Sequence, residues 1–131
     1  MPLRRKQLSP RLKTVLSFVK GKCLADIGTD HGYLPIEACL EGIIEQALAC
    51  DYFPGPLSKA VENIRRFGLE SQIETRLGFG LEPLTPGEAD CVVISGMGGM
   101  KIISILDKSP KVIEKVKYCL YLFSKIFISL L

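Results

Sequence analysis

The stretch that decides the fold is Leu24-Ala25-Asp26-Ile27-Gly28-Thr29-Asp30-His31-Gly32-Tyr33-Leu34. Residues 23–27, which begin one residue before this stretch, predict a short buried strand. A turn that contains glycine follows, and a helix is expected from Tyr33. A strand, an acid, a glycine turn and a helix are the parts of a nucleotide-cofactor site at the carboxyl end of a first parallel strand. Gly28 has no Cβ and lets the backbone approach a ligand closely. The alternative is an ordinary strand-to-helix turn with polar residues.

The alternation of strands and helices continues along the chain. Right-handed βαβ units of this kind predict an α/β fold with a doubly wound parallel sheet of the Rossmann-like type. Ser9-Pro10 marks the start of a first helix, with serine as the N-cap and proline at the first helical position. Strands are expected at residues 23–27, 46–51, 73–77 and 89–94, and further helices at 33–41, around 57–64 and at 100–107.

Composition limits the class of protein. The chain has 131 residues, 47% hydrophobic and 24% charged, so one globular domain over residues 1–131 is expected. Its five cysteines are widely spaced and form no C-x-x-C pair, which predicts buried thiols in a reducing cytoplasm and no metal site. The charged N-terminus lacks an apolar stretch behind it, so no signal peptide is expected.

The net charge of +3 hides a pattern along the chain. Residues 1–22, the expected basic N-terminal helix, carry seven Lys or Arg and no acid. Residues 23–100 carry four basic and twelve acidic side chains, and residues 101–131 carry six basic and two acidic ones. The two basic end segments could bind a polyanion at the edge of a cofactor-binding domain formed by the acidic middle segment. The alternative is a solvated basic helix.

The apolar tail, residues 118–131, departs from the rest of the chain. A membrane span needs about 20 apolar residues, and Lys125 interrupts this segment, so no membrane partner is expected. Two interpretations of the tail are equally open: residues 118–123 form a fifth strand, or the tail no longer follows the ancestral sequence. If 118–123 fail to pair, the fourth strand has an open edge. Exposed aromatic and aliphatic residues here predict self-association.

Asp51 ends the second expected strand, 23 residues beyond Gly28. A doubly wound fold places there the carboxylate that accepts both ribose hydroxyls, while the alternative role is an N-cap of the next helix. The G-x-G-x-x-G fingerprint is absent, which counts against a dehydrogenase. An acidic D-x-G-x-D-x-G turn suits a cofactor without pyrophosphate and with a cationic amino-acid end. S-adenosyl-L-methionine is such a molecule.

His31 is the only histidine in the chain. Beside Asp30 it has two interpretations, a base or a structural hydrogen bond, and we favour the second. No zinc-ligand spacing is present.

Three blocks carry a specific resemblance: Leu24 to Pro35 (LADIGTDHGYLP), Arg76 to Glu82 (RLGFGLE) and Ile94 to Gly99 (ISGMGG). They resemble the bacterial tRNA (adenine(22)-N(1))-methyltransferase family over about residues 8–117, which leaves 23–117 as the family-like core. The resemblance implies a class I methyltransferase fold, S-adenosyl-L-methionine as cofactor, and tRNA as substrate. It also implies a C-terminal helical hairpin that helps to hold tRNA.

The resemblance also implies roles for single residues. Asp26, Gly28 and Asp30 would line the methionine end of the cofactor, and Asp51 would hold its ribose. Independently of the resemblance, we expect Asp30 to be the carboxylate that takes the proton released by the methylated base. The expected cofactor-binding residues are Asp26, Gly28, Thr29, Asp30, His31, Asp51, Gly78, Phe79 and Gly80; the catalytic ones are Asp30, Ser95, Gly96 and Met97; the substrate-binding ones are Arg4, Arg5, Arg11, Gly98 and Gly99.

Two features depart from the family pattern. Phe79 stands where the family has Asp or Asn between two glycines, and a ring stacks on adenine but accepts nothing from its amino group. The similarity fades after Lys117 and the helical hairpin is missing, which predicts a truncated or frameshifted member with impaired tRNA methylation. The alternatives are a non-catalytic remnant that binds cofactor or RNA, and a small-molecule methyltransferase of the same fold.

Overall fold

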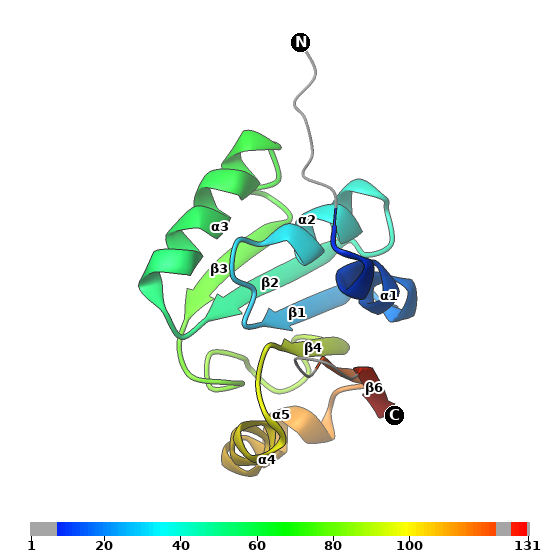
Figure 1. Cartoon of the computed structure of the whole chain (residues 1–131), viewed down its shortest axis with the longest axis vertical. Coiled ribbons are helices and arrows are strands. Elements are labelled where there is room, and N and C mark those ends of the chain that lie inside the picture. The colour runs from blue at the N-terminus through cyan, green and yellow to red at the C-terminus, as the bar shows by residue number, and fades with distance from the viewer. Residues whose placement is uncertain (1–7, 123–126, 131) are drawn as a thin grey trace.

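A six-stranded sheet lies between two layers of helices in the computed structural model, which describes residues 8–122 and 127–130 (Figure 1). The helices are α1 (Pro10–Phe18), α2 (Tyr33–Leu40), α3 (Pro54–Arg66), α4 (Gly99–Lys108) and α5 (Pro110–Glu114). The strands are β1 (Cys23–Ile27), β2 (Gln46–Asp51), β3 (Ile73–Leu77), β4 (Cys91–Ser95), β5 (Tyr118–Leu122) and β6 (Phe127–Leu130).

The strand order confirms the doubly wound α/β fold. The sheet runs β3-β2-β1-β4-β5-β6, in which β1 to β5 are parallel and β6 pairs antiparallel with β5. The chain moves outward from β1 to β3 and then returns to place β4 on the other side of β1. The carboxyl ends of β1 and β4 therefore form the switch point at which such sheets bind ligands.

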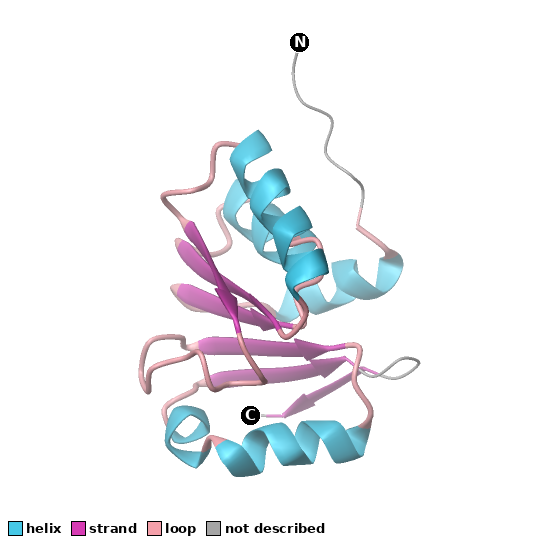
Figure 2. Ribbon diagram, turned by 90° about the vertical axis from the view of Figure 1, so that its left-hand side faces the viewer, coloured by secondary structure: helices cyan, strands magenta, loops and turns pink. Residues whose placement is uncertain are grey.

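Alternate residues of the central strands β1, β2 and β4, and of β5, enter two separate cores. Leu24 packs with the residues of α1, α2 and α3, whereas its neighbour Ala25 packs with those of α4 and α5. Figure 2 shows these two helical layers on opposite faces of the sheet. Both faces of the central strands are thus covered, which explains why β1, β2 and β4 consist mainly of apolar residues.

The helix boundaries follow from local chemistry. Ser9 Oγ accepts a hydrogen bond from the Leu12 amide at 3.3 Å, and Pro10 opens α1, as predicted. Helix α3 begins at Pro54, before the apolar stripe that indicated it, because proline is accommodated in a first helical turn. The short helix α5 and strand β6 were not predicted.

Strand β5 confirms the predicted fifth strand and corrects one expectation for the tail. It pairs in parallel with β4 along its length, so the edge of β4 is not open. Cys119, Leu120 and Tyr121 are buried in the two cores, not exposed as we expected of this segment. Residues 123–126 and 131 lie outside the described part of the chain.

None of the helices in the described ranges is long and apolar enough to cross a membrane.

We predict that Leu120→Ala lowers the free energy of unfolding by about 2–5 kcal/mol, because the side chain is only 2% exposed and its removal leaves a cavity beneath α1. The measurement is urea unfolding followed by circular dichroism. Lys117→Ala, an exposed position just before β5, is the control and should change stability by less than about 0.5 kcal/mol. Equal effects of the two substitutions would show that β5 does not belong to the core.

Candidate functional site

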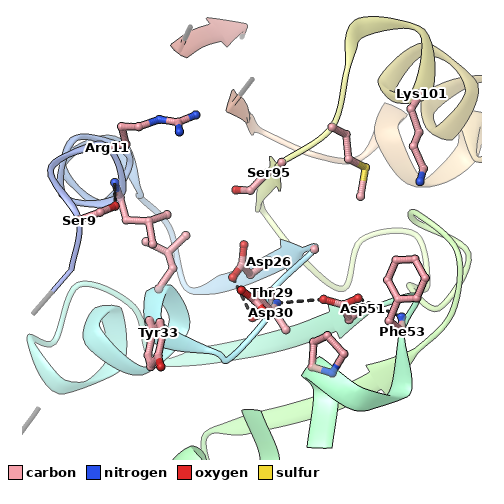
Figure 3. A pocket seen from close by; sticks show the side chains of 16 residues that line it. Ser9, Arg11, Asp26, Thr29, Asp30, Tyr33, Asp51, Phe53, Ser95 and Lys101 are labelled. Carbon is pink, nitrogen blue, oxygen red and sulfur yellow. Dashed lines mark hydrogen bonds between the residues drawn. The ribbon is translucent and has the colours of Figure 1, made fainter. Parts of the chain in front are cut away.

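A pocket of about 580 Å³ lies at the switch point, where the loops after β1, β2 and β4 meet α1 and the start of α4 (Figure 3). Its volume falls in the usual range for small-molecule and cofactor sites. Many of the site residues predicted from the sequence line it. They are Asp26, Gly28, Thr29, Asp30, Asp51, Ser95, Gly96, Met97 and Arg11.

The Asp51 carboxylate holds two loops of the pocket together. Its Oδ2 accepts a hydrogen bond from the Asp30 amide at 2.9 Å, and its Oδ1 accepts one from the Phe53 amide at 3.0 Å. The first bond fixes the loop after β1 and the second fixes the start of α3. Each carboxylate oxygen keeps a second lone pair, so Asp51 can still accept from a ligand hydroxyl.

The turn after β1 is tightly constrained. The Gly28 and Thr29 amides both donate to the Cys50 carbonyl, at 3.0 and 2.9 Å. Gly28 has φ +77°, and a Cβ there would lie 2.9 Å from the Ser95 carbonyl oxygen. Asp30 also takes a left-handed conformation, with φ +57°. The glycine is therefore required by the close passage of this turn beside the end of β4.

Two buried oxygens in the pocket have no hydrogen-bond partner within the described residues, Asp26 Oδ1 and Ser95 Oγ. The other Asp26 oxygen accepts from Thr29 Oγ1 at 2.9 Å. Burial raises the pKa of the Asp26 carboxyl to about 7, against the lowering effect of the Thr29 hydrogen bond. Unpaired buried polar atoms are unfavourable, so both oxygens indicate a polar or cationic ligand group. This chemistry fits the amino-acid end of S-adenosyl-L-methionine.

Charges of opposite sign are separated within the pocket. Asp26, Asp30 and Asp51 lie on its inner wall, whereas Arg11 of α1 and Lys101 of α4 lie at its two outer sides (Figure 3). Arg11 was predicted as a substrate contact, but Lys101 was missed. The sequence offered one signal for Lys101, a cation two residues after the Gly-Met-Gly-Gly segment.

His31 does not line the pocket. Its Nδ1 lies 2.8 Å from Asp30 Oδ1, and its ring stacks on Tyr33 with centroids 5.5 Å apart. Its carbonyl accepts from Asn63 Nδ2 at 2.9 Å. These contacts match the structural hydrogen bond that we favoured over a basic role.

The segment Gly78-Phe79-Gly80 also stays outside the pocket lining. The Phe79 and Tyr52 rings meet edge to face, with their centroids 6.1 Å apart. Lys108 Nζ lies 4.8 Å from the centroid of the Phe79 ring. A Cβ on Gly80 would lie 2.7 Å from the Ile105 side chain, so this glycine serves the packing of α4. The predicted contact between Phe79 and adenine therefore has no direct support from the pocket geometry.

The remaining predicted contacts are not in the pocket. Gly98 and Gly99 form the N-cap and the first residue of α4 and do not line it. Arg4 and Arg5 lie outside the described residues. The pocket is also lined by apolar residues that were not predicted from the sequence. Two of them are Phe53 and Pro56, which follow Asp51 at the start of α3.

The cysteines fit the prediction of free, largely buried thiols. Burial raises the pKa of Cys39 and of Cys91 to about 11, so both remain protonated and unreactive. No cluster of possible metal ligands occurs in the described ranges.

Comparison with known proteins agrees with this geometry. Residues 8–125 match the family model described as a methyltransferase domain. The chain belongs to this methyltransferase-domain family. The domain is 43% identical over 102 residues to the tRNA (adenine(22)-N(1))-methyltransferase of Bacillus subtilis strain 168. That alignment covers 77% of this chain and 43% of the relative.

Solved structures show the same likeness in three dimensions. The crystal structure of the B. subtilis m1A22 tRNA methyltransferase TrmK is 39% identical, with a TM-score of 0.81, and the match covers 88% of this chain and 50% of that one. The M. capricolum TrmK structure, in complex with S-adenosyl-homocysteine, is 37% identical, with a TM-score of 0.79 and coverage of 87% and 51%. This methyltransferase domain thus spans about half the length of the relatives it matches.

We predict that Asp26→Asn removes a pH dependence of stability. The folded protein holds the Asp26 proton up to about pH 7, whereas an unfolded chain releases it near pH 4. Stability therefore falls as the pH rises through this window, by up to about 4 kcal/mol. Urea unfolding at several pH values should show a flatter profile for the variant.

The matched control is Asp107→Asn, because that carboxylate is exposed on α4. Its pH profile should follow the wild type. An Asp26→Asn profile that also follows the wild type would place the Asp26 titration outside this window.

Proposed function

We propose that this chain binds S-adenosyl-L-methionine and transfers its methyl group to N1 of an adenine in tRNA, at the position-22 site. The observation that carries the proposal is the pair of unpartnered oxygens, Asp26 Oδ1 and Ser95 Oγ, inside a pocket at the switch point. The likeness to tRNA (adenine(22)-N(1))-methyltransferases supports the choice of substrate. A tRNA substrate also implies action in the cytoplasm.

In this proposal different residues of the pocket bind different parts of the cofactor. Asp26, with Thr29 and Asp30 beside it, holds the cationic amino-acid end, because a carboxylate with one unpaired oxygen fits an ammonium group. Asp51 accepts the ribose hydroxyls with its remaining lone pairs. The apolar faces of Phe53 and Pro56 lie next to Asp51 along the chain and suit the base.

The bound cofactor supplies a methyl group on a sulfonium that is already activated as a leaving group. The protein then acts mainly by positioning, because the N1 lone pair of adenine needs no base to attack. Ser95, Gly96 and Met97 form the wall on which the target base would rest. The side chain of Asp30 is 66% exposed and hydrogen-bonded to His31, and it is the proposed acceptor of the proton that the product releases.

Two other functions are compatible with this pocket. A chain that binds cofactor or RNA without turnover would share this pocket. A small-molecule methyltransferase would share it as well, because the fold is used for many substrates. Calorimetry with the cofactor separates binders from non-binders, and a tRNA methylation assay separates the two enzyme functions.

We predict that Asp51→Ala weakens S-adenosyl-L-methionine binding by about 1–3 kcal/mol, since the ribose hydroxyls would lose their acceptor. Isothermal titration calorimetry measures the change. Asp51→Asn is a second variant that tests whether a loss of affinity comes from the ribose contact or from a disturbed fold. It keeps the size of the side chain and one acceptor oxygen. Asp107→Ala, on the exposed face of α4, should leave the affinity unaltered.

The same preparations test the reaction. Wild-type protein should methylate a tRNA transcript with adenine at position 22 and not one with guanine there. Methylation of both transcripts, or of neither in the presence of bound cofactor, would argue against the proposed substrate.

Self-association through the tail is also part of the proposal. Strand β6 lies at the outer edge of the described sheet, and an edge strand offers unpaired backbone groups to a second chain. We predict that Ile128→Lys shifts the protein toward monomer in sedimentation velocity at several concentrations, because an edge lysine disfavours pairing. A wild-type protein that sediments as a monomer throughout would contradict this part.

A further inference from the structure

The outer rim of the pocket carries two cations from distant parts of the chain. Arg11 belongs to α1 and Lys101 to α4, and both side chains are exposed and line the pocket. Figure 3 shows them on opposite sides, with the side chain of Arg11 directed from α1 toward the middle of the site and the amino group of Lys101 directed toward Phe53. The space between them lies above Ser95 and the acidic inner wall.

This arrangement fits a substrate that is anionic outside the pocket and neutral inside it. The buried Asp26 and Asp51 carboxyl groups lie deep in the pocket, and the exposed Asp30 carboxylate lies near them, so negative charge disfavours a phosphate group at depth. Cations at the rim, in contrast, attract phosphates that stay at the surface. A nucleotide within an RNA strand has both properties, because its base is uncharged and a phosphate lies on each side of it.

The chemistry of the target atom leads to the same geometry. N1 lies on the pairing edge of adenine, so a base that reacts there must leave its partner and enter the pocket. The strand on either side of an extruded base remains outside. Its two neighbouring phosphates then pass over opposite sides of the rim, where Arg11 and Lys101 stand.

We propose that Arg11 and Lys101 bind the RNA phosphates on either side of the nucleotide whose base enters the pocket. This inference rests on the proposed function and adds to it a residue of α4, at the other end of the chain from the basic N-terminus. Lys101 is thereby a positioning residue, since it holds the strand and not the reacting atoms.

The test compares Arg11→Gln and Lys101→Gln with two exposed lysines that do not line the pocket. Lys13→Gln is the control on α1, and Lys111→Gln is the control on α5. The probe is a tRNA transcript with adenine at position 22, bound at salt concentrations of about 50 to 200 mM. Each of the two rim variants, Arg11→Gln and Lys101→Gln, should weaken tRNA binding by about threefold to tenfold. The slope of the logarithm of the binding constant against the logarithm of the salt concentration should fall in magnitude by about 0.7–0.9, as for one lost phosphate contact.

Cofactor binding by the same proteins locates the effect. The affinity for S-adenosyl-homocysteine should stay within about twofold for both rim variants, because the phosphates belong to RNA. A large loss of S-adenosyl-homocysteine affinity in Arg11→Gln, with unaltered tRNA binding, would assign Arg11 to the cofactor carboxylate and overturn the two-sided contact. Rim variants that match their controls on tRNA would also overturn it.

tRNA binding and methylation by the wild-type protein distinguish a failure of this inference from a failure of the proposed function. If wild-type protein binds and methylates the tRNA while the rim variants match the controls, only the phosphate contacts fail. If wild-type protein neither binds nor methylates the tRNA, the proposed function fails, and the inference fails with it. A double variant that weakens binding by the product of the two single effects would show that the contacts act independently, as two separate phosphates require.

Discussion

The hydrogen bonds of the Asp51 carboxylate are the constraint on which the pocket depends. One oxygen accepts from the Asp30 amide and the other from the Phe53 amide, so this carboxylate joins the loops after β1 and β2. Asp30 stands in the left-handed region, a conformation that a non-glycine residue keeps only when its surroundings hold it. The same carboxylate that is proposed to bind ribose therefore also shapes the wall beside it.

The sequence predicted β1, β2 and β3 at the residues that they occupy. Strands β1 and β2 are apolar along most of their length and are bounded by turn residues, and the half-exposed β3 shows an alternating pattern. The buried strand β4 lies at Cys91–Ser95 and not at the predicted 89–94, because the apolar Ala89 is buried without belonging to the strand. Helix α5 has five residues, too few for a helical stripe to be visible. Strand β6 was not predicted because its residues belong to a largely apolar tail, in which no turn signal marks where one strand ends and the next begins.

The site was predictable where a residue's position on a strand decides its role. Asp26, Asp51 and Ser95 lie at or near strand ends that meet at the switch point, and topology alone brings them together. Phe79 and Lys101 show the limit of that reasoning. Whether the residue after a strand faces the ligand or packs against a helix depends on the path of its loop, and here Phe79 packs beside Lys108.

The buried Asp26 carboxyl has a thermodynamic consequence for any cationic ligand. With a pKa near 7, much of this group carries its proton in the free protein around neutral pH. An ammonium group that pairs with it requires the ionised form, so the complex expels a proton into the buffer. The heat of complex formation then includes the ionisation enthalpy of whichever buffer receives that proton, and the number of protons released can be read from the variation of this heat among buffers.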